Sequence, residues 1–205
     1  MKPLAWLCGL TVVGCTLAGC GADEPNVGSA VPTLDLVEPF YGPEQADLVL
    51  GGQKMPVAVE LEQDNQQVVL SALLDGVVLE RERYLLTDEA LYFVGFEDDE
   101  FDPPIRLLTL PEMVEPSEWE WQGDYLTGDF ETPASAEVSA EAGSRMIAGQ
   151  IHNRAVTVRI SLNILRSESG SQRLLDFVFV PEQGVIERNL NDSSIRTLRE
   201  EAESS

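Results

Sequence analysis

The stretch R-A-V-T-V-R-I-S-L-N-I-L-R, residues 154–166, carries the clearest structural signal in this sequence. Its apolar residues fall on every second position from Val156 to Ile164, and polar residues stand between them. A period of two is typical of a β-strand that buries one face and exposes the other, as strands of antiparallel sheets do. We therefore predict a half-buried antiparallel strand here.

The same period, interrupted by turn residues, recurs along much of the chain. Asp75-Gly76 is the strongest hairpin signal, because both residues tolerate the positive φ that a tight two-residue turn needs. The sequence thus predicts a meander of antiparallel strands. The expected strands are 57–62, 66–74, 77–86, 90–96, 105–110, 118–122, 135–140, 154–166, 172–180 and 185–190.

We expect a mainly β fold, an antiparallel meander that forms a curled sheet or half-open barrel, because no long helical period follows residue 19. A period of two fits an open and a closed sheet equally well. Ser193 or Ser194 is a suitable N-cap for a short C-terminal helix that contains Ile195 and Leu198.

Composition narrows the class of protein. The chain has 205 residues, 36 acidic and 13 basic side chains, and a formal net charge of −23. This length suits one ordinary domain, and 43% hydrophobic residues are typical of a globular protein. Because nucleic acids and anionic lipid surfaces repel a strongly acidic protein, we expect neither as a partner.

The amino terminus has the pattern of a targeting segment. Lys2 is positive, and the run from Leu4 to Ala18 has no charge. At about 15 residues it is shorter than the ~20 that cross a bilayer as a helix, so it fits the apolar region of a signal peptide. The run ends in Leu17-Ala18-Gly19-Cys20, which resembles the lipobox of bacterial lipoproteins.

That resemblance implies that Cys20 is the lipid-attachment residue. The signal peptide would be removed before Cys20, whose thiol would receive a diacylglycerol and whose amine would receive an acyl chain such as palmitate, and these chains would anchor the protein stably in a membrane. Gly21 stands where Asp would favour the inner membrane, so the resemblance implies the outer membrane, facing the periplasm. Cys8 and Cys15 lie in the removed segment, which leaves no thiol for a disulfide, a metal or a nucleophile.

Residues 21–32 are rich in Gly, Ala, Pro, Asn and Ser and have no apolar period, which is typical of a flexible tether. The expected organisation is a signal peptide at 1–19, the lipidated Cys20 with its tether at 20–32, a β domain at 33–192, and a short helix with an acidic tail at 193–205.

Polar motifs give no catalytic residue, metal or cofactor. His152 is the only histidine, lies in an expected turn, and has neither a Gly-x-Ser-x-Gly elbow nor a cysteine to work with. The acidic run 97–102 lacks the spacing and central glycine of an EF-hand, so we interpret it as a solvated loop. A catalytic carboxylate pair remains open, since acidic residues are abundant but none are singled out.

Trp119 and Trp121 place two large rings on one face of an expected strand. If the two rings are exposed, they form a surface for a ligand or a partner. If they are buried, they are principal core residues. The acidic residues that alternate with them favour the buried alternative, because such residues suit the solvent-facing side of the strand. The same two roles, core residue or exposed binding surface, are open for Phe40 and Tyr41. Trp119 to Trp121, followed by Gly184 to Arg188, resembles uncharacterised bacterial periplasmic β domains of the half-barrel type, a similarity that implies no catalytic residues.

Three functions follow as hypotheses. The first is a membrane-anchored, non-enzymatic binding or envelope-assembly module with a protein partner. The second is a carrier that holds an apolar ligand or lipid inside the curled sheet, on a dry concave face lined by Val156, Ile160, Phe177 and Trp119. The third is a hydrolase that uses two carboxylates.

Overall fold

A computed structural model of the chain describes residues 31–32, 34–37, 44–110, 113–165, 171–190 and 193–196. The expected signal peptide, the lipid-attachment residue Cys20, and Phe40 and Tyr41 lie outside the described residues. Almost all of the described chain is β-strand. In chain order, the elements are β1 (Val31–Pro32), α1 (Leu34–Val37), β2 (Gln45–Leu50), β3 (Gln53–Asp64), β4 (Gln67–Leu74), β5 (Val77–Leu86), β6 (Ala90–Phe96), β7 (Asp99–Thr109), β8 (Met113–Val114), β9 (Ser117–Thr127), β10 (Phe130–Ile147), β11 (Gln150–Ile164), β12 (Ser171–Val180), β13 (Gly184–Leu190) and β14 (Ser193–Arg196).

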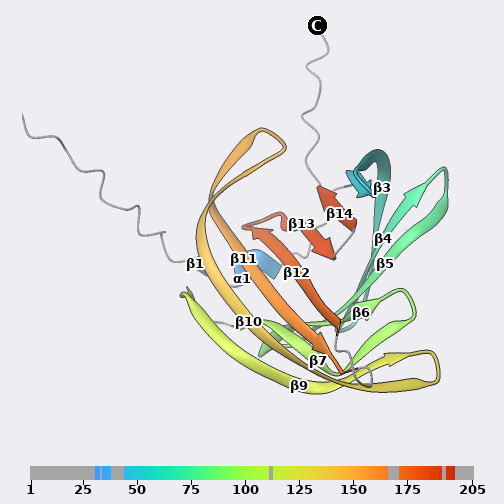
Figure 1. Cartoon of the computed structure of the whole chain (residues 1–205). Coiled ribbons are helices and arrows are strands. Elements are labelled where there is room, and N and C mark those ends of the chain that lie inside the picture. The colour runs from blue at the N-terminus through green and yellow to red at the C-terminus, as the bar shows by residue number, and fades with distance from the viewer. Residues whose placement is uncertain are drawn as a thin grey trace, which may run out of the picture.

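The sheet is a curled antiparallel meander, as the sequence predicts (Figure 1). Its strands follow one another around a ring from β9 through β14 and from β2 to β7. Four residue pairs, from Asp99–Thr127 to Asp102–Asp124, join β7 to β9 and close the ring into a barrel. β1 and β8 form a separate two-stranded sheet.

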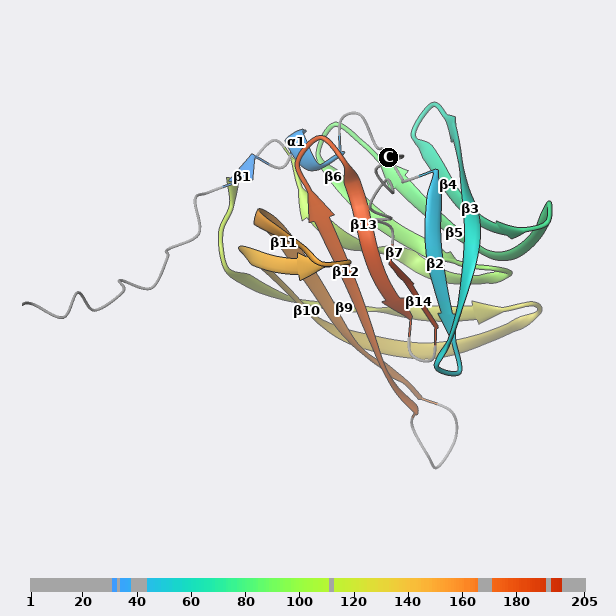
Figure 2. The ribbon, with the colours of Figure 1, turned by 90° about the horizontal axis from the view of Figure 1, so that it is seen from above.

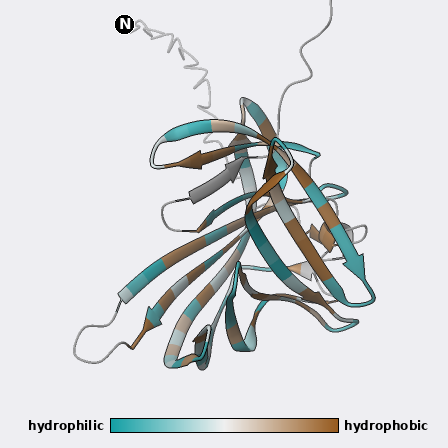
Figure 3. Cartoon of the chain, turned by 90° about the vertical axis from the view of Figure 1, so that its right-hand side faces the viewer, coloured by the Kyte–Doolittle hydropathy of each residue, from teal (hydrophilic) through white to brown (hydrophobic). Residues whose placement is uncertain are grey.

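The strand predicted from the opening stretch is confirmed. β11 buries Val156, Val158, Ile160, Leu162 and Ile164 completely. Of the polar residues between them, Arg159 and Asn163 are exposed, Ser161 is partly exposed and Thr157 is buried. Figure 3 shows the resulting alternation of hydrophobic and hydrophilic residues along the strands of the sheet. The hairpin at Asp75-Gly76 is also confirmed, and both of its residues have positive φ, at 52° and 79°.

Two expectations about the ends of the domain differ from the structure. Val31 and Pro32, assigned to the tether, pair with β8, and Val31 is fully buried. Ser193–Arg196 pair with β13 and β2 as strand β14, so no helix begins at Ser193 or Ser194. The remainder of the expected helix and acidic tail, 197–205, lies outside the described residues.

The two ends of the barrel differ in what covers them. At the plugged end, α1 packs against β13, and its Leu36 and Val37 are fully buried in the main core together with Val31. The opposite end, which we call the open end, carries the turns 51–52, 75–76 and 97–98. These turns follow β2, β4 and β6. Figure 2 shows α1 and the β2–β3 turn on opposite sides of the sheet.

An aromatic cluster fills part of the interior of the barrel. Phe93 lies at its centre, with its ring 5.0 Å from Phe177, 5.5 Å from Tyr84 and 5.8 Å from Phe101. All four side chains are at most 1% exposed. The interior at this level is a filled core, held together by burial of large apolar area.

Candidate functional site

The open end of the barrel carries a cavity of about 800 Å³ that is widely open to solvent. Its wall is made of residues from β2 to β5 on one side and from β12 and β13 on the other. The lining residues are Leu48, Leu50, Met55, Leu74, Leu79, Glu80, Glu97, Ser171, Gln172, Arg173 and Leu190. Six of these eleven side chains are apolar, and such a volume is in the ordinary range for small-ligand pockets, about 300–1,000 Å³.

Two of the lining leucines are exposed to solvent at the mouth of the cavity. Leu50 is 52% exposed and Leu79 is 40% exposed, and Val77 and Val78, next to Leu79 on β5, are 62% and 39% exposed. Isolated exposed apolar residues are normal, but a group of them around a cavity marks a surface suited to binding.

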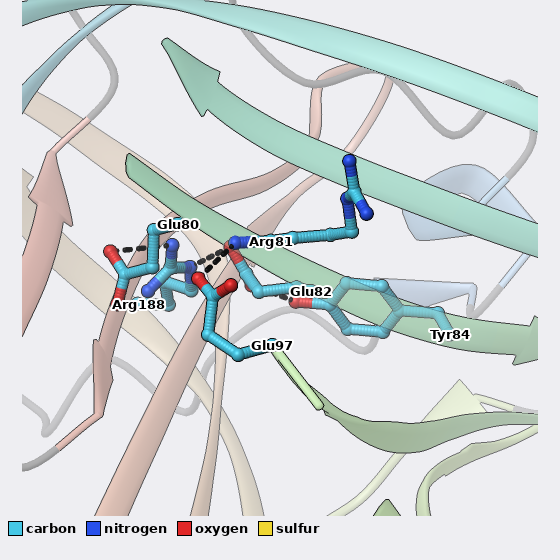
Figure 4. A network of polar contacts seen from close by, with 6 residues as sticks. All are labelled: Glu80, Arg81, Glu82, Tyr84, Glu97 and Arg188. Carbon is cyan, nitrogen blue, oxygen red and sulfur yellow. Dashed lines mark hydrogen bonds and ion pairs between the residues drawn. The ribbon is translucent and has the colours of Figure 1, made fainter. Parts of the chain in front are cut away.

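A buried ion network lies beside the cavity, and Glu80 belongs to both (Figure 4). Arg188 on β13 reaches across the interior to β5, where its Nε pairs with Glu82 and its Nη2 lies 3.3 Å from Glu80 Oε2. The side chains of Arg188 and Glu82 are 4% and 2% exposed, whereas that of Glu80 is 15% exposed. Glu80 is thus the member of the network nearest to solvent.

Tyr84 completes the network on its inner side. Its hydroxyl donates a hydrogen bond to Glu82 Oε2 at 2.5 Å, so both oxygens of Glu82 have partners. Burial raises the pKa of the Glu82 carboxyl, against the opposing effects of Arg188 and the Tyr84 hydroxyl. Burial also raises the pKa of Tyr84 well above its ordinary value, and the charge of Glu82 adds to this effect.

Arg188 is the least satisfied member of the network. Its Nη1 is buried and has no hydrogen-bond partner in the described part of the chain. Burial lowers the pKa of Arg188, but the carboxylates of Glu82 and Glu80 outweigh this effect and keep it above its ordinary value. The guanidinium is therefore charged and neutralised by two carboxylates.

A second polar group comes from β12 and borders the cavity at Arg173. Its Nη1 donates to the Tyr125 hydroxyl at 3.2 Å, and its guanidinium carbon lies 5.5 Å from the centre of the Tyr125 ring. The Tyr125 hydroxyl in turn donates to Asp99. Burial and this bond to Asp99 raise the pKa of Tyr125.

Trp119 and Trp121 lie in the wall of the barrel and not on a protruding surface. Trp121 is 8% exposed, and Trp119 is partly buried against the main core, which is the core alternative of the two that the sequence allowed. Their indole N–H groups donate to the carbonyls of Arg106 (from Trp119, 3.2 Å) and Pro103 (from Trp121, 2.9 Å) on β7. The two rings therefore join β9 to β7 beyond the four closing residue pairs.

The other polar motifs do not converge on a reaction centre. His152 lies within β11, partly buried, rather than in a turn. In the acidic run, Glu97 accepts the Arg81 amide at 2.8 Å, and Glu100 pairs with Arg83 at 3.2 Å. Among the described residues, no group of three or more His, Cys, Asp and Glu side chains is placed to hold a metal ion.

Glu80 and Glu82 are two carboxylates that the structure brings together, and the sequence singled out neither of them. They meet at Arg188, and Glu82 is enclosed with both oxygens engaged, so it has no free atom to offer a ligand. Glu80 is the one of the two carboxylates that lines the cavity. The sequence signal for Arg188 was weak: it alternates with Leu190, but a register shift in the β12–β13 pairing interrupts the alternation before it, and Ile186 belongs to a separate buried cluster.

Comparisons with known proteins found no protein family, no curated protein and no solved structure that matches this chain. No helix in the described ranges has the length and apolar character needed to cross a membrane.

Proposed function

We propose that this chain is a non-enzymatic, lipid-anchored binding protein of the cell envelope, and that its open end holds an apolar ligand. The cavity of about 800 Å³ at the open end, lined mainly by Leu and Met side chains, carries this proposal. Apolar cavities with a few placed polar groups are the usual form of small-ligand sites.

The position of the cavity differs from the one expected for a carrier. Val156, Ile160 and Phe177, expected to line a dry concave face, are fully buried in the aromatic and aliphatic core. The binding space lies nearer the open end and is lined by β2 to β5, β12 and β13.

The expected anchor supports an orientation for this site. Cys20 precedes Val31 by eleven residues, a length that spans at most about 40 Å when extended. Val31 belongs to the plugged end, so the chain enters the barrel on the side away from the cavity. We propose that the open end faces away from the anchoring membrane and exchanges its ligand with the periplasmic space.

Fluorescence of N-phenyl-1-naphthylamine, a neutral apolar dye, tests the site. The mature chain, residues 20–205 with Cys20→Ser, lacks both the apolar signal segment and the acyl acceptor, so it can be studied without detergent and without its own lipid entering the cavity. We expect saturable dye binding, weakened about tenfold by Leu50→Asp, since a charge in an apolar site costs roughly 1–3 kcal/mol.

Ile151→Asp is the matched control, because Ile151 is also exposed, at 64%, but lies in the β10–β11 hairpin. It should leave dye binding unchanged. Absence of dye binding, or equal losses in the two variants, would refute the proposed site. Metabolic labelling with a fatty acid tests the anchor, and a chain that keeps the label after Cys20→Ser would refute it.

A further inference from the structure

The geometry points to a cationic amphiphile as the ligand of the open end, with its aliphatic chain among the leucines and its positive group between Glu97 and Glu80. This inference rests on the proposed function, and it adds the chemical class of the ligand. It follows from how apolar and charged side chains divide the cavity.

The apolar side chains form one continuous part of the lining. Leu48 and Leu50 come from β2, Met55 from the neighbouring β3, and Leu74 and Leu79 from β4 and β5. These strands are consecutive neighbours in the sheet, so their inward side chains form a single apolar wall. A flexible aliphatic chain suits such a wall, since Leu and Met adapt to its shape.

The acidic side chains mark where a charged group would lie. Glu97 sits in the turn between β6 and β7, is exposed, and uses Oε1 to accept the Arg81 amide. Glu80 lines the same cavity from β5, and Arg81, which binds Glu97, is its next neighbour in the chain. Both carboxylates border the cavity: Glu80 shares the Arg188 guanidinium with Glu82, and Glu97 accepts a backbone amide.

The two arginines beside the cavity already have partners. Arg188 pairs with two carboxylates and is 3% exposed, so an incoming anion finds it enclosed. Arg173 borders the cavity, but its guanidinium is held by the hydroxyl and ring of Tyr125, which bonds Asp99. The side chains of Arg173 and Arg188 therefore offer little attraction to a phosphate or a fatty carboxylate.

The surroundings strengthen the same preference. Asp75 and Asp98 are exposed in two turns of the open end, and the whole chain carries a net charge of −23. A cavity rimmed by one sign of charge concentrates ligands of the opposite sign and repels those of its own. An ammonium group at the mouth would be attracted by both the local carboxylates and the overall field.

Three ligands of equal chain length test this inference in the Cys20→Ser chain. Decylamine is cationic at neutral pH, decanol is neutral and decanoate is anionic, and each is titrated as a competitor of the bound dye. We expect decylamine to bind about tenfold more tightly than decanoate, with decanol between them. The difference should shrink in about 0.5 M salt, since exposed charges are screened.

Glu97→Gln separates charge from shape. It removes the negative charge but keeps an oxygen that can accept the Arg81 amide, so we expect decylamine affinity to fall about threefold or more while decanol affinity stays constant. Glu62→Gln is the matched control, because Glu62 is also exposed but lies near the far end of β3. It should change neither affinity.

The outcomes distinguish this inference from the proposed function. If decanoate binds as tightly as decylamine, or if Glu97→Gln has no more effect than Glu62→Gln, the inferred ligand class is refuted while the apolar site stands. If none of the three ligands displaces the dye, the inference is refuted, and if the dye itself does not bind, both proposals are.

Discussion

Arg188 on β13 and Glu82 on β5 form an ion pair through the interior of the barrel, with side chains 4% and 2% exposed. Four strands, β14, β2, β3 and β4, separate β13 from β5 around the ring, so the pair joins opposite walls and not neighbouring strands. Removing two charges from water costs several kcal/mol per ion, which Tyr84 and Glu80 offset with further contacts. The network thus braces the walls beside the open-end cavity.

Replacement of Arg188 by Met should destabilise the protein strongly. The substitution leaves the Glu82 carboxylate buried without its counter-ion, and losing one partner of a buried pair costs about 3–5 kcal/mol. Urea denaturation at neutral pH measures this loss in the free energy of unfolding. Adding Glu82→Leu to Arg188→Met should recover most of it, because an apolar pair of similar volume needs no compensation.

Arg159→Met is the matched control for this prediction. Arg159 Nε lies 2.8 Å from Asp176 Oδ1, but the Arg159 side chain is 51% exposed. Exposed pairs contribute only about 0–1 kcal/mol, so this variant should unfold near the native urea midpoint. Equal losses in Arg188→Met and Arg159→Met would contradict a cross-barrel brace.

The pKa of Glu82 predicts a specific pH dependence. Burial raises this pKa above its ordinary value of 4.5, so the folded protein holds the proton more tightly than the unfolded chain does. Binding of this proton contributes to the free energy of unfolding, and the contribution is fully present below pH 4.5, the ordinary pKa of the carboxyl. The contribution is lost as the pH rises through the pKa that Glu82 has in the folded protein. The native protein should therefore lose stability relative to Glu82→Gln between acidic and neutral pH.

Comparing urea midpoints of the two proteins at several pH values cancels the titration of the other carboxylates, which both proteins share. The informative quantity is the change in their difference with pH, not its size. If the native protein instead gains stability relative to Glu82→Gln as the pH rises, the prediction is contradicted. That result would mean that the charge of Arg188 outweighs burial and lowers the pKa of Glu82.

The strands that could be predicted are those whose inward residues are large. β4, β5 and β6 lie within one residue of their expected bounds, because branched and aromatic side chains mark their buried faces. β10 was expected only over 135–140 but spans Phe130–Ile147. Its inward residues include Ala134 and Ala136, small side chains that give a weak periodic signal.

The small residues of β10 have a reason that appears only in three dimensions. Ala136 pairs with Trp121 and Val138 with Trp119, so short side chains leave space for the two indoles. The ion network was unpredictable for a related cause, since Arg188 and Glu82 meet across the barrel and no local spacing links them. Alternation can assign a residue to the buried face of a strand, but it cannot say which buried residues of distant strands face each other.

Gly123 and Gly143 should respond oppositely to alanine. A Cβ at Gly123 would lie 2.3 Å from the Asp102 carbonyl oxygen and 2.7 Å from Trp121 Cζ2, where β9 meets β7. Overpacking of this kind costs about 1–3 kcal/mol. Gly143 has open space at the same position, so Gly143→Ala should be neutral or stabilise by up to about 1 kcal/mol, by restricting the unfolded chain.

Thermal unfolding followed by tryptophan fluorescence measures both glycine variants, because Trp121 reports directly on the contact at Gly123. A Gly123→Ala protein with native stability would show that β7 and β9 are not held as closely as the structure has them. Gly143→Ala verifies that alanine in this sheet is not harmful by itself.

Leu36→Ala tests whether the amino-terminal segment is part of the barrel core. Leu36 is fully buried in α1 and packs in the main core at the plugged end, so its truncation should cost about 2–5 kcal/mol, as other buried leucines do. Leu50→Ala, at a 52% exposed leucine of the open end, should cost less than about 1 kcal/mol. Urea denaturation compares the two variants. Because the expected lipid anchor joins the barrel through this segment, a Leu36→Ala protein as stable as Leu50→Ala would mean that α1 does not fix the plugged end, and the proposed outward orientation of the cavity would lose its structural support.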